Sequence, residues 1–135
     1  MMREIIFRGK RVDNGEWVFG FYIWDNPDTI GVIENDESVN AGWLEEYEVI
    51  PETLGQYTGI KDRNGKMIFE GDICSYLTPE YKDNGVHYEP KRENGKVEIT
   101  NGGIFFGGWQ YATPFGGCIS SIEIIGNIHD QKEDV

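Results

Sequence analysis

The sequence is poor in cysteine and in positive charge. Only two of its 135 residues are cysteines. Cys74 and Cys118 do not form a C-x-x-C pair, so neither a zinc motif nor a disulfide framework is predicted. Basic residues number 12 against 24 acidic ones, which gives a formal net charge of −12 at pH 7. Because nucleic-acid-binding proteins present a broad basic surface, free DNA or RNA is not expected to be the main partner.

Long hydrophobic runs are missing as well. Residues 1–10 mix charged with apolar side chains and lack the apolar core of a signal peptide, which predicts a cytoplasmic protein. The longest uncharged stretch, residues 99–122, is interrupted by glycines and amides, so no transmembrane segment is predicted. Helical spacing is confined to residues 41–47, where we expect at most one short helix.

Turn signals are abundant instead. Short runs of β-branched and aromatic residues lie between Asn-Gly pairs, and each such pair suits the tight turn of a β-hairpin. The polar segment 78–94 is expected to form a long exposed hairpin or loop. The sequence therefore predicts a mainly β fold that is rich in hairpins. The Asn-Gly pairs begin at Asn14, Asn64, Asn84, Asn94 and Asn101.

The length and the apolar content of 39% suit one domain over residues 1–135 with a single core. Pro51 marks a tight connection, so we expect an N-terminal subdomain over residues 1–50 and a small barrel over residues 51–135. Between residues 102 and 117, paired glycines stand beside aromatic residues. This composition is typical of the strongly bent strands of a small barrel.

The negative charge is concentrated in one segment. Residues 12–60 contain eleven Asp and Glu residues and no Lys or Arg. One interpretation is a solvated acidic face that keeps the protein soluble. The other is a surface that binds a basic partner or mimics nucleic acid.

Two ligand-binding motifs are approached but not matched. Gly59 and Gly65-Lys66 resemble a phosphate-binding loop, but five residues separate the glycines where four are needed, and Met67 replaces the Ser or Thr. A calcium loop starting at Asp62 would have its glycine two positions too early. Accordingly, no metal site and no cofactor are predicted.

Glu70 and Asp72 have a spacing that would place both carboxylates on one side of a strand. A small hydrolase could use such a pair as general acid and base. The favoured alternative is that Gly71 and Asp72 shape a turn before a strand that enters the core. No nucleophile motif is present either, so the chain is not expected to be an enzyme.

A binding role has more support from the sequence. Tyr57 lies between Gln56 and Thr58 in a segment that reads as a loop, and an exposed tyrosine with polar neighbours suits an interface. The alternative is a tyrosine packed over the edge of the core. Trp17 lies in the acidic half, where an aromatic anchor would suit a partner that carries Arg or Lys.

Four blocks of the sequence, taken together, point to a known family. The most specific is VIPETLGQYTGIKDRNGKMIFEGDI, residues 49–73, and the others are residues 5–10, 15–20 and 124–128. In this order they resemble the YopX protein family of bacteriophages and prophages. Cys74 stands where the family more often has a small aliphatic residue.

The resemblance implies a β-rich phage or prophage protein of the bacterial cytoplasm. It implies an SH3-like barrel in the C-terminal part and an N-terminal part that serves in self-association, but no catalytic residue. We predict a non-enzymatic accessory protein that binds a macromolecular partner, most readily a host or phage protein, and that forms a homo-oligomer. The candidate partner-binding residues are Arg8, Trp17, Gln56, Tyr57, Thr58 and Asp62.

The alternative is a local nucleic-acid site within the acidic chain. It requires the basic residues near the N-terminus and those of the central block to gather into one patch. These residues are Arg3, Arg8, Lys10, Arg11, Lys61, Arg63 and Lys66.

Overall fold

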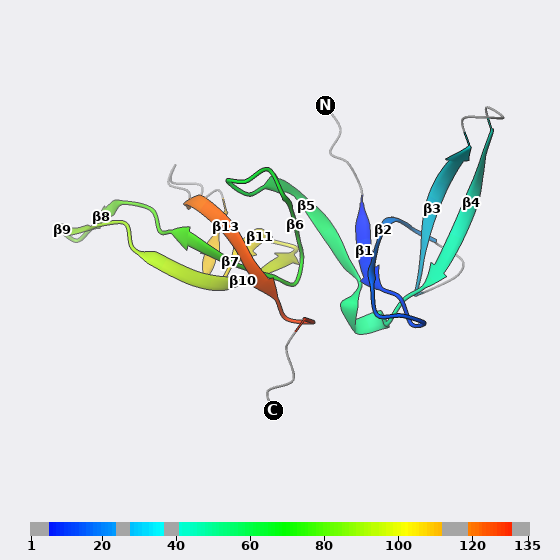
Figure 1. Ribbon diagram of the computed structural model, residues 1–135. Helices are drawn as coiled ribbons and strands as arrows, with labels where there is room; N and C mark the ends of the chain where they lie inside the picture. The colour runs from blue at the N-terminus through cyan, green and yellow to red at the C-terminus, as the bar shows by residue number, and fades with distance from the viewer. Residues whose placement is uncertain (1–5, 24–27, 37–40, 112–118, 131–135) are drawn as a thin grey trace. The chain divides into compact units, whose positions relative to one another are not determined.

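The mainly β fold is confirmed by a computed structural model of the chain (Figure 1). The chain divides into two compact units, Met1–Tyr57 and Thr58–Val135. The division falls after Tyr57 rather than near residue 50, because the strand that follows Pro51 begins in the first unit. The SH3-like barrel stays a prediction. The structure describes residues 6–23, 28–36, 41–111 and 119–130.

The first unit holds β4, β3, β2, β1 and the start of β5, in this order, from a six-stranded sheet whose last strand, β6, belongs to the second unit. Gly15, with φ of 73°, lies in the turn between β1 and β2. The 3-10 helix η1 (Pro51–Thr53) precedes β5. Its strands are β1 (Phe7–Lys10), β2 (Trp17–Tyr22), β3 (Thr29–Asp36), β4 (Ala41–Glu48) and the start of β5 (Gly55–Lys61).

The helical spacing of residues 41–47 does not produce a helix. This segment belongs to β4, which pairs with β3 from Thr29 opposite Glu48 to Asp36 opposite Ala41. A helix this short is unstable by itself, whereas the strand gains backbone hydrogen bonds along the whole length of its neighbour. Tertiary pairing has therefore overridden a weak local preference.

Side chains from several strands form the core of the first unit. Ile30 and Val49 are buried, and the rings of Phe7 and Tyr22 lie 5.8 Å apart on the same side of the sheet. Gly9 is required for space, because a Cβ there would lie 2.8 Å from the Cβ of Val49. These contacts fix β1 and β2 against the segment that follows β4.

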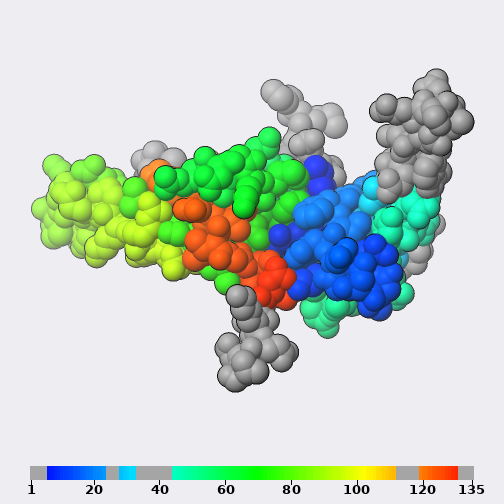
Figure 2. All heavy atoms as spheres, in the orientation of Figure 1, coloured from blue at the N-terminus to red at the C-terminus, as the bar shows by residue number. Residues whose placement is uncertain are grey.

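The second unit contains the rest of β5 and a five-stranded antiparallel sheet with the order β12-β11-β10-β7-β13. A separate two-stranded hairpin, β8-β9, projects beyond this sheet (Figure 2). The remaining strands are β6 (Met67–Phe69), β7 (Asp72–Leu77), β8 (Tyr81–Asp83), β9 (Val86–Tyr88), β10 (Arg92–Thr100), β11 (Gly103–Phe106), β12 (Trp109–Gln110) and β13 (Ser120–Asn127).

The core of the second unit is larger. In β7 the alternate residues Cys74 and Tyr76 point inward, as expected for a strand with one buried face. Burial, followed by the charges of Asp72 and Asp62, raises the pKa of the Cys74 thiol to about 12. The buried core residues are Ile68, Cys74, Tyr76, Val97, Phe106, Ile119 and Ile122.

The Asn-Gly pairs have two different roles. Asn84 and Gly85 have φ values of 51° and 79°, as a type I′ hairpin turn requires, so the turn predicted there is confirmed. The turn predicted at Asn94-Gly95 is wrong, because both residues lie within β10, opposite Ser75 and Cys74.

Candidate functional site

One face of the first unit's sheet gathers aromatic and basic side chains. Residues directly opposite each other in an antiparallel pair place their side chains on the same face. Lys10 lies opposite Trp17, and Arg8 lies opposite Phe19. Phe21 follows at the next alternate position of β2 and therefore shares this face.

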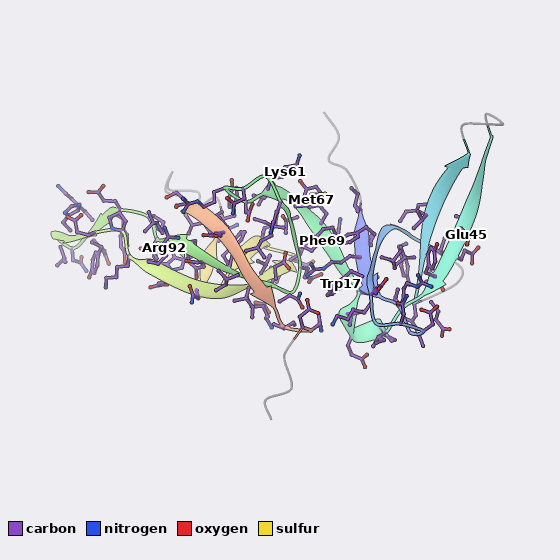
Figure 3. All side chains as sticks on the ribbon, viewed as in Figure 1. Trp17, Glu45, Lys61, Met67, Phe69 and Arg92 are labelled. Carbon is purple, nitrogen blue, oxygen red and sulfur yellow. The ribbon has the colours of Figure 1, made fainter. Side chains whose placement is uncertain are left out.

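Two cations lie over the indole ring of Trp17 on this face. The guanidinium carbon of Arg8 is 4.3 Å from the ring centroid, and the Nζ of Lys10 is 5.5 Å from it. Attraction between a cation and an aromatic ring at such distances stabilises the pair. Arg8 is buried and Trp17 is half-buried. The two side chains pack against each other at one end of this face, where Figure 3 labels Trp17.

The rest of the face is exposed and apolar. Phe19 is 49% exposed, Phe21 39% and Leu44 45%. Phe21 covers Gly31 on β3, since a Cβ at Gly31 would lie 2.8 Å from the Cζ of Phe21. On β4, Glu46 lies opposite Gly31 and therefore on the same face as Phe21. Leu44 lies two positions before Glu46, so it shares this face. The aromatic face is defined as Arg8, Lys10, Trp17, Phe19, Phe21 and Leu44.

Carboxylates border the aromatic face. Glu46 and Glu48 are exposed, and their register with β3 places them on the same side of the sheet as Phe21. The turn between β1 and β2 carries two further exposed carboxylates, Glu16 and Asp13, of which Asp13 is paired with Arg11. The aromatic face is therefore apolar in its middle and acidic at its border.

Arg11 forms an ion pair with Asp13 near the turn between β1 and β2. Its guanidinium donates to both carboxylate oxygens of Asp13, at 2.7 and 3.0 Å, and lies 4.6 Å from the ring centroid of Tyr47. The hydrogen bond lowers the pKa of Asp13 and raises the pKa of Arg11. An open hollow of about 330 Å³ here is lined by Arg11, Val12, Asp13, Glu46, Tyr47 and Glu48.

The central residues predicted to bind a partner are not presented as a loop. Tyr57 is 3% exposed, and its backbone N–H donates to the carbonyl of Ile6 at 2.7 Å. Of the two interpretations of Tyr57, the tyrosine packed over the edge of the core is confirmed, because the segment is strand β5 and not a loop. Gln56 lies opposite Phe7, so it points to the face of the sheet opposite to Arg8.

Thr58 and Asp62 belong to the second unit and hold its first hairpin. The hydroxyl of Thr58 donates to the carbonyl of Ile68 at 2.8 Å. The carboxylate of Asp62 accepts hydrogen bonds from the backbone N–H groups of Asn64, Lys66 and Ile124 at 2.9–3.1 Å. Burial raises the pKa of Asp62, but these donors outweigh it and leave the pKa below its usual value.

The side chain of Asp72 also accepts a hydrogen bond from the backbone of a nearby turn. Its side chain is buried, and its Oδ2 accepts a hydrogen bond from the backbone N–H of Phe69 at 2.8 Å. Gly71 between the strands has φ of 95°. The predicted turn before β7 is therefore confirmed, and Asp72 is held in that turn.

The basic residues of the proposed nucleic-acid patch fall in both units. Arg8 and Lys10 lie over Trp17, and Arg11 binds Asp13. Arg3 lies outside the described residues, and the patch stays a prediction. The second unit holds Lys61, Arg63 and Lys66.

Sequence reasoning missed the exposed residues of the aromatic face. A signal was available, because Trp17, Phe19 and Phe21 alternate at a spacing of two and would share one face of any strand. Trp24 lies outside the described residues, as does the side chain of Trp43, so their role as aromatic anchors stays a prediction.

These observations define a small β-sheet protein with an aromatic, acid-bordered face on its first unit. Among the described residues, no helix is long and apolar enough to cross a membrane. The chain belongs to the YopX family, since the family model described as YopX protein matches residues 6–133. No curated protein and no solved structure matched the chain.

Proposed function

We propose that this YopX protein is a non-enzymatic accessory protein of phage or prophage origin that binds a protein partner through its aromatic face. The observation that carries this proposal is the exposure of Phe19, Phe21 and Leu44 together on one side of the first unit's sheet. Aromatic side chains are enriched in the buried centres of protein interfaces. Covering these three side chains would remove apolar surface from water, which favours association.

The charge around the face selects the chemistry of the partner. Glu46 and Glu48 lie on the same side of the sheet as Phe21 and Leu44, and segment 12–60 carries no Lys or Arg. A partner with an apolar patch bordered by Lys and Arg would be complementary. A second copy of the same face would bring the acidic borders together, so a different protein is the favoured occupant.

The experiment is affinity capture of the full chain from a bacterial host lysate at low and moderate salt. The test variant is Phe19→Ser with Phe21→Ser. The matched control is Ile125→Ser, because Ile125 is 52% exposed on β13 of the second unit. We expect a partner to be retained by the wild type and the control, to be lost by the double variant, and to bind more weakly as salt rises. Equal capture by the double variant would refute the proposal.

Self-association is measured separately. Sedimentation of the wild type and the double variant over a range of concentrations reports whether the aromatic face joins two copies of the chain. A concentration-dependent mass that falls in the double variant would favour the predicted homo-oligomer over a different protein partner.

A further inference from the structure

The hairpin β8-β9 turns through a single Asn-Gly pair. Asp83 pairs with Val86 across the hairpin, so Asn84 and Gly85 alone form the turn between the strands. Both turn residues are exposed, and a Cβ added at Gly85 would meet nothing within 4 Å beyond the adjoining residues. Glycine has no side chain to hinder an attack of its backbone nitrogen on the preceding asparagine. The tip of the hairpin therefore has both the reacting groups and the space for this reaction.

We propose that Asn84 is a site of spontaneous deamidation. The backbone nitrogen of Gly85 loses its proton to solvent and attacks Cγ of Asn84. The new C–N bond closes a succinimide ring, and the side-chain nitrogen takes up a proton from solvent and leaves as ammonia. Water then opens the ring at either of its carbonyl groups, which leaves aspartate or isoaspartate at position 84. The reaction consumes only water and needs no oxidant, reductant or enzyme.

The attacking nitrogen and the asparagine side chain are both free to move at this tip. The structure describes residues 78–94 throughout, and within them neither the N–H of Gly85 nor the side chain of Asn84 makes a hydrogen bond to a described residue. An N–H that faces water exchanges its proton readily, because no acceptor in the protein has to be given up first. The first step of the reaction is therefore unobstructed.

The other four Asn-Gly pairs are held in place. Asn94-Gly95 lies within β10, where a Cβ at Gly95 would be 2.6 Å from the backbone of Gly107, so a succinimide ring has no room. At the remaining three pairs a hydrogen bond ties up the glycine N–H and must break before the nitrogen can attack. Gly15 donates to the carbonyl of Arg11 and Gly65 to that of Asp62, each at 2.9 Å, and Gly102 donates to the hydroxyl of Thr100 at 3.2 Å.

The turn at Asn84 is also the easiest to open. The attack requires a rotation of the Asn84 backbone that breaks the type I′ turn. β8 and β9 have three exposed residues each and form a separate two-stranded sheet, and such a hairpin is only marginally stable in water. The turns at Gly15 and Gly65 join strands of the six-stranded sheet instead, where more pairing has to be lost.

The two products alter the hairpin differently. Aspartate adds one negative charge beside Asp83. Isoaspartate also adds one carbon atom to the main chain, so the two-residue turn no longer has the geometry that suits the strands. The stacked rings of Tyr81 and Tyr88, 4.7 Å apart, would then lose their register. This change is independent of the aromatic face, which lies on the first unit.

The test is incubation of the full chain at pH 8, both native and in urea, followed by mass spectrometry of tryptic fragments. Each of the five Asn-Gly pairs falls in a different tryptic fragment, and the exchange of NH₂ for OH raises the mass of that fragment. In the native chain we expect Asn84 to convert at least about fivefold faster than the other four, which is the factor that one hydrogen bond makes. In urea the five rates should converge.

Ion-exchange chromatography of the whole chain gives a second readout, because deamidation adds a negative charge. Asn84→Gln should abolish the shift of the native chain, since the longer side chain closes its ring far more slowly. The matched control Asn14→Gln should leave the shift unchanged. Another pair that converts first in the native chain, five equal native rates, or a shift that persists in Asn84→Gln would overturn the proposal.

Discussion

At the scale of single residues, burial separates structural side chains from those that can be probed for binding. Tyr57 is almost fully buried, whereas Phe19 is half exposed. We expect Tyr57→Ala to lower the free energy of unfolding by roughly 3–5 kcal/mol, as removal of other buried aromatic rings does. Urea unfolding checks this, with Tyr57→Phe as the control that keeps the ring. A variant of unchanged stability would show that the ring is not part of the core.

Asp62 should make stability depend on pH. Its pKa is lowered from 3.8 in the folded state, so its contribution is fully present above the unfolded value and is lost as the pH falls through the lower folded value. We expect Asp62→Asn to cost roughly 1–3 kcal/mol at pH 7, because an amide N–H₂ would then face the N–H of Ile124.

The measurement is urea unfolding of the wild type and Asp62→Asn at pH 7 and at pH 3. The difference between them should shrink at pH 3, where protonation begins to remove the wild-type advantage. Asp83→Asn, at an exposed position of β8, is the control. A difference that stays constant over this range would contradict the assigned hydrogen bonds.

At the scale of secondary structure, Gly95 shows that a strand can need a glycine because there is no room for a side chain, and not because of its backbone torsion angles. A Cβ at this position would lie 2.6 Å from both the Cα and N of Gly107 and 2.8 Å from the hydroxyl of Tyr76. Backbone atoms cannot give way as a flexible side chain can. We expect Gly95→Ala to destabilise the second unit by roughly 1–3 kcal/mol.

Thermal unfolding followed by circular dichroism measures this cost. Gly102→Ala is the matched control, because its nearest neighbour would be 3.6 Å away, which is an ordinary contact. Equal melting temperatures for both variants would mean that β10 and β11 have room to separate near Gly95.

These elements also show what could be predicted from the sequence. The hairpin character and the Asn84-Gly85 turn follow from local backbone preferences, and they are confirmed. Asn94-Gly95 has the same local signal, but its place in β10 depends on the packing of β11 against Tyr76. The strand at residues 41–48 depends on pairing with β3. Such long-range pairing leaves no mark in a short window of sequence.

The candidate sites were predicted less well for the same reason. Arg8 and Trp17 do lie together, but the burial of Tyr57 and Thr58 follows from strand β5.

At the scale of the whole molecule, the two units differ in how much apolar surface they bury. Among the described residues, the first unit buries Ile30, Val49 and Tyr57, whereas the second has the seven-residue cluster that includes Cys74 and Val97. Regions with more buried apolar contacts open less often. We expect the amides of β7 and β10 to exchange with deuterium more slowly than those of β2 and β3.

Hydrogen exchange followed by mass spectrometry of proteolytic fragments checks this order. The β8-β9 hairpin, whose residues are all exposed, should exchange fastest within the second unit. Slower exchange in β2 and β3 than in β7 would show that the first unit is the more stable one.

The low reactivity of the Cys74 thiol has a practical consequence for fluorescent labelling of this protein. A buried sulfur with a pKa of about 12 gives almost no thiolate at neutral pH and therefore resists maleimide dyes. In the Cys118→Ser background, a cysteine introduced at Asp83, beside the hairpin turn, would be the one reactive handle among the described residues. A fluorophore there would sit at the tip of an exposed hairpin, where the chain tolerates additions, and would report on tumbling and on complex formation at single-molecule dilution.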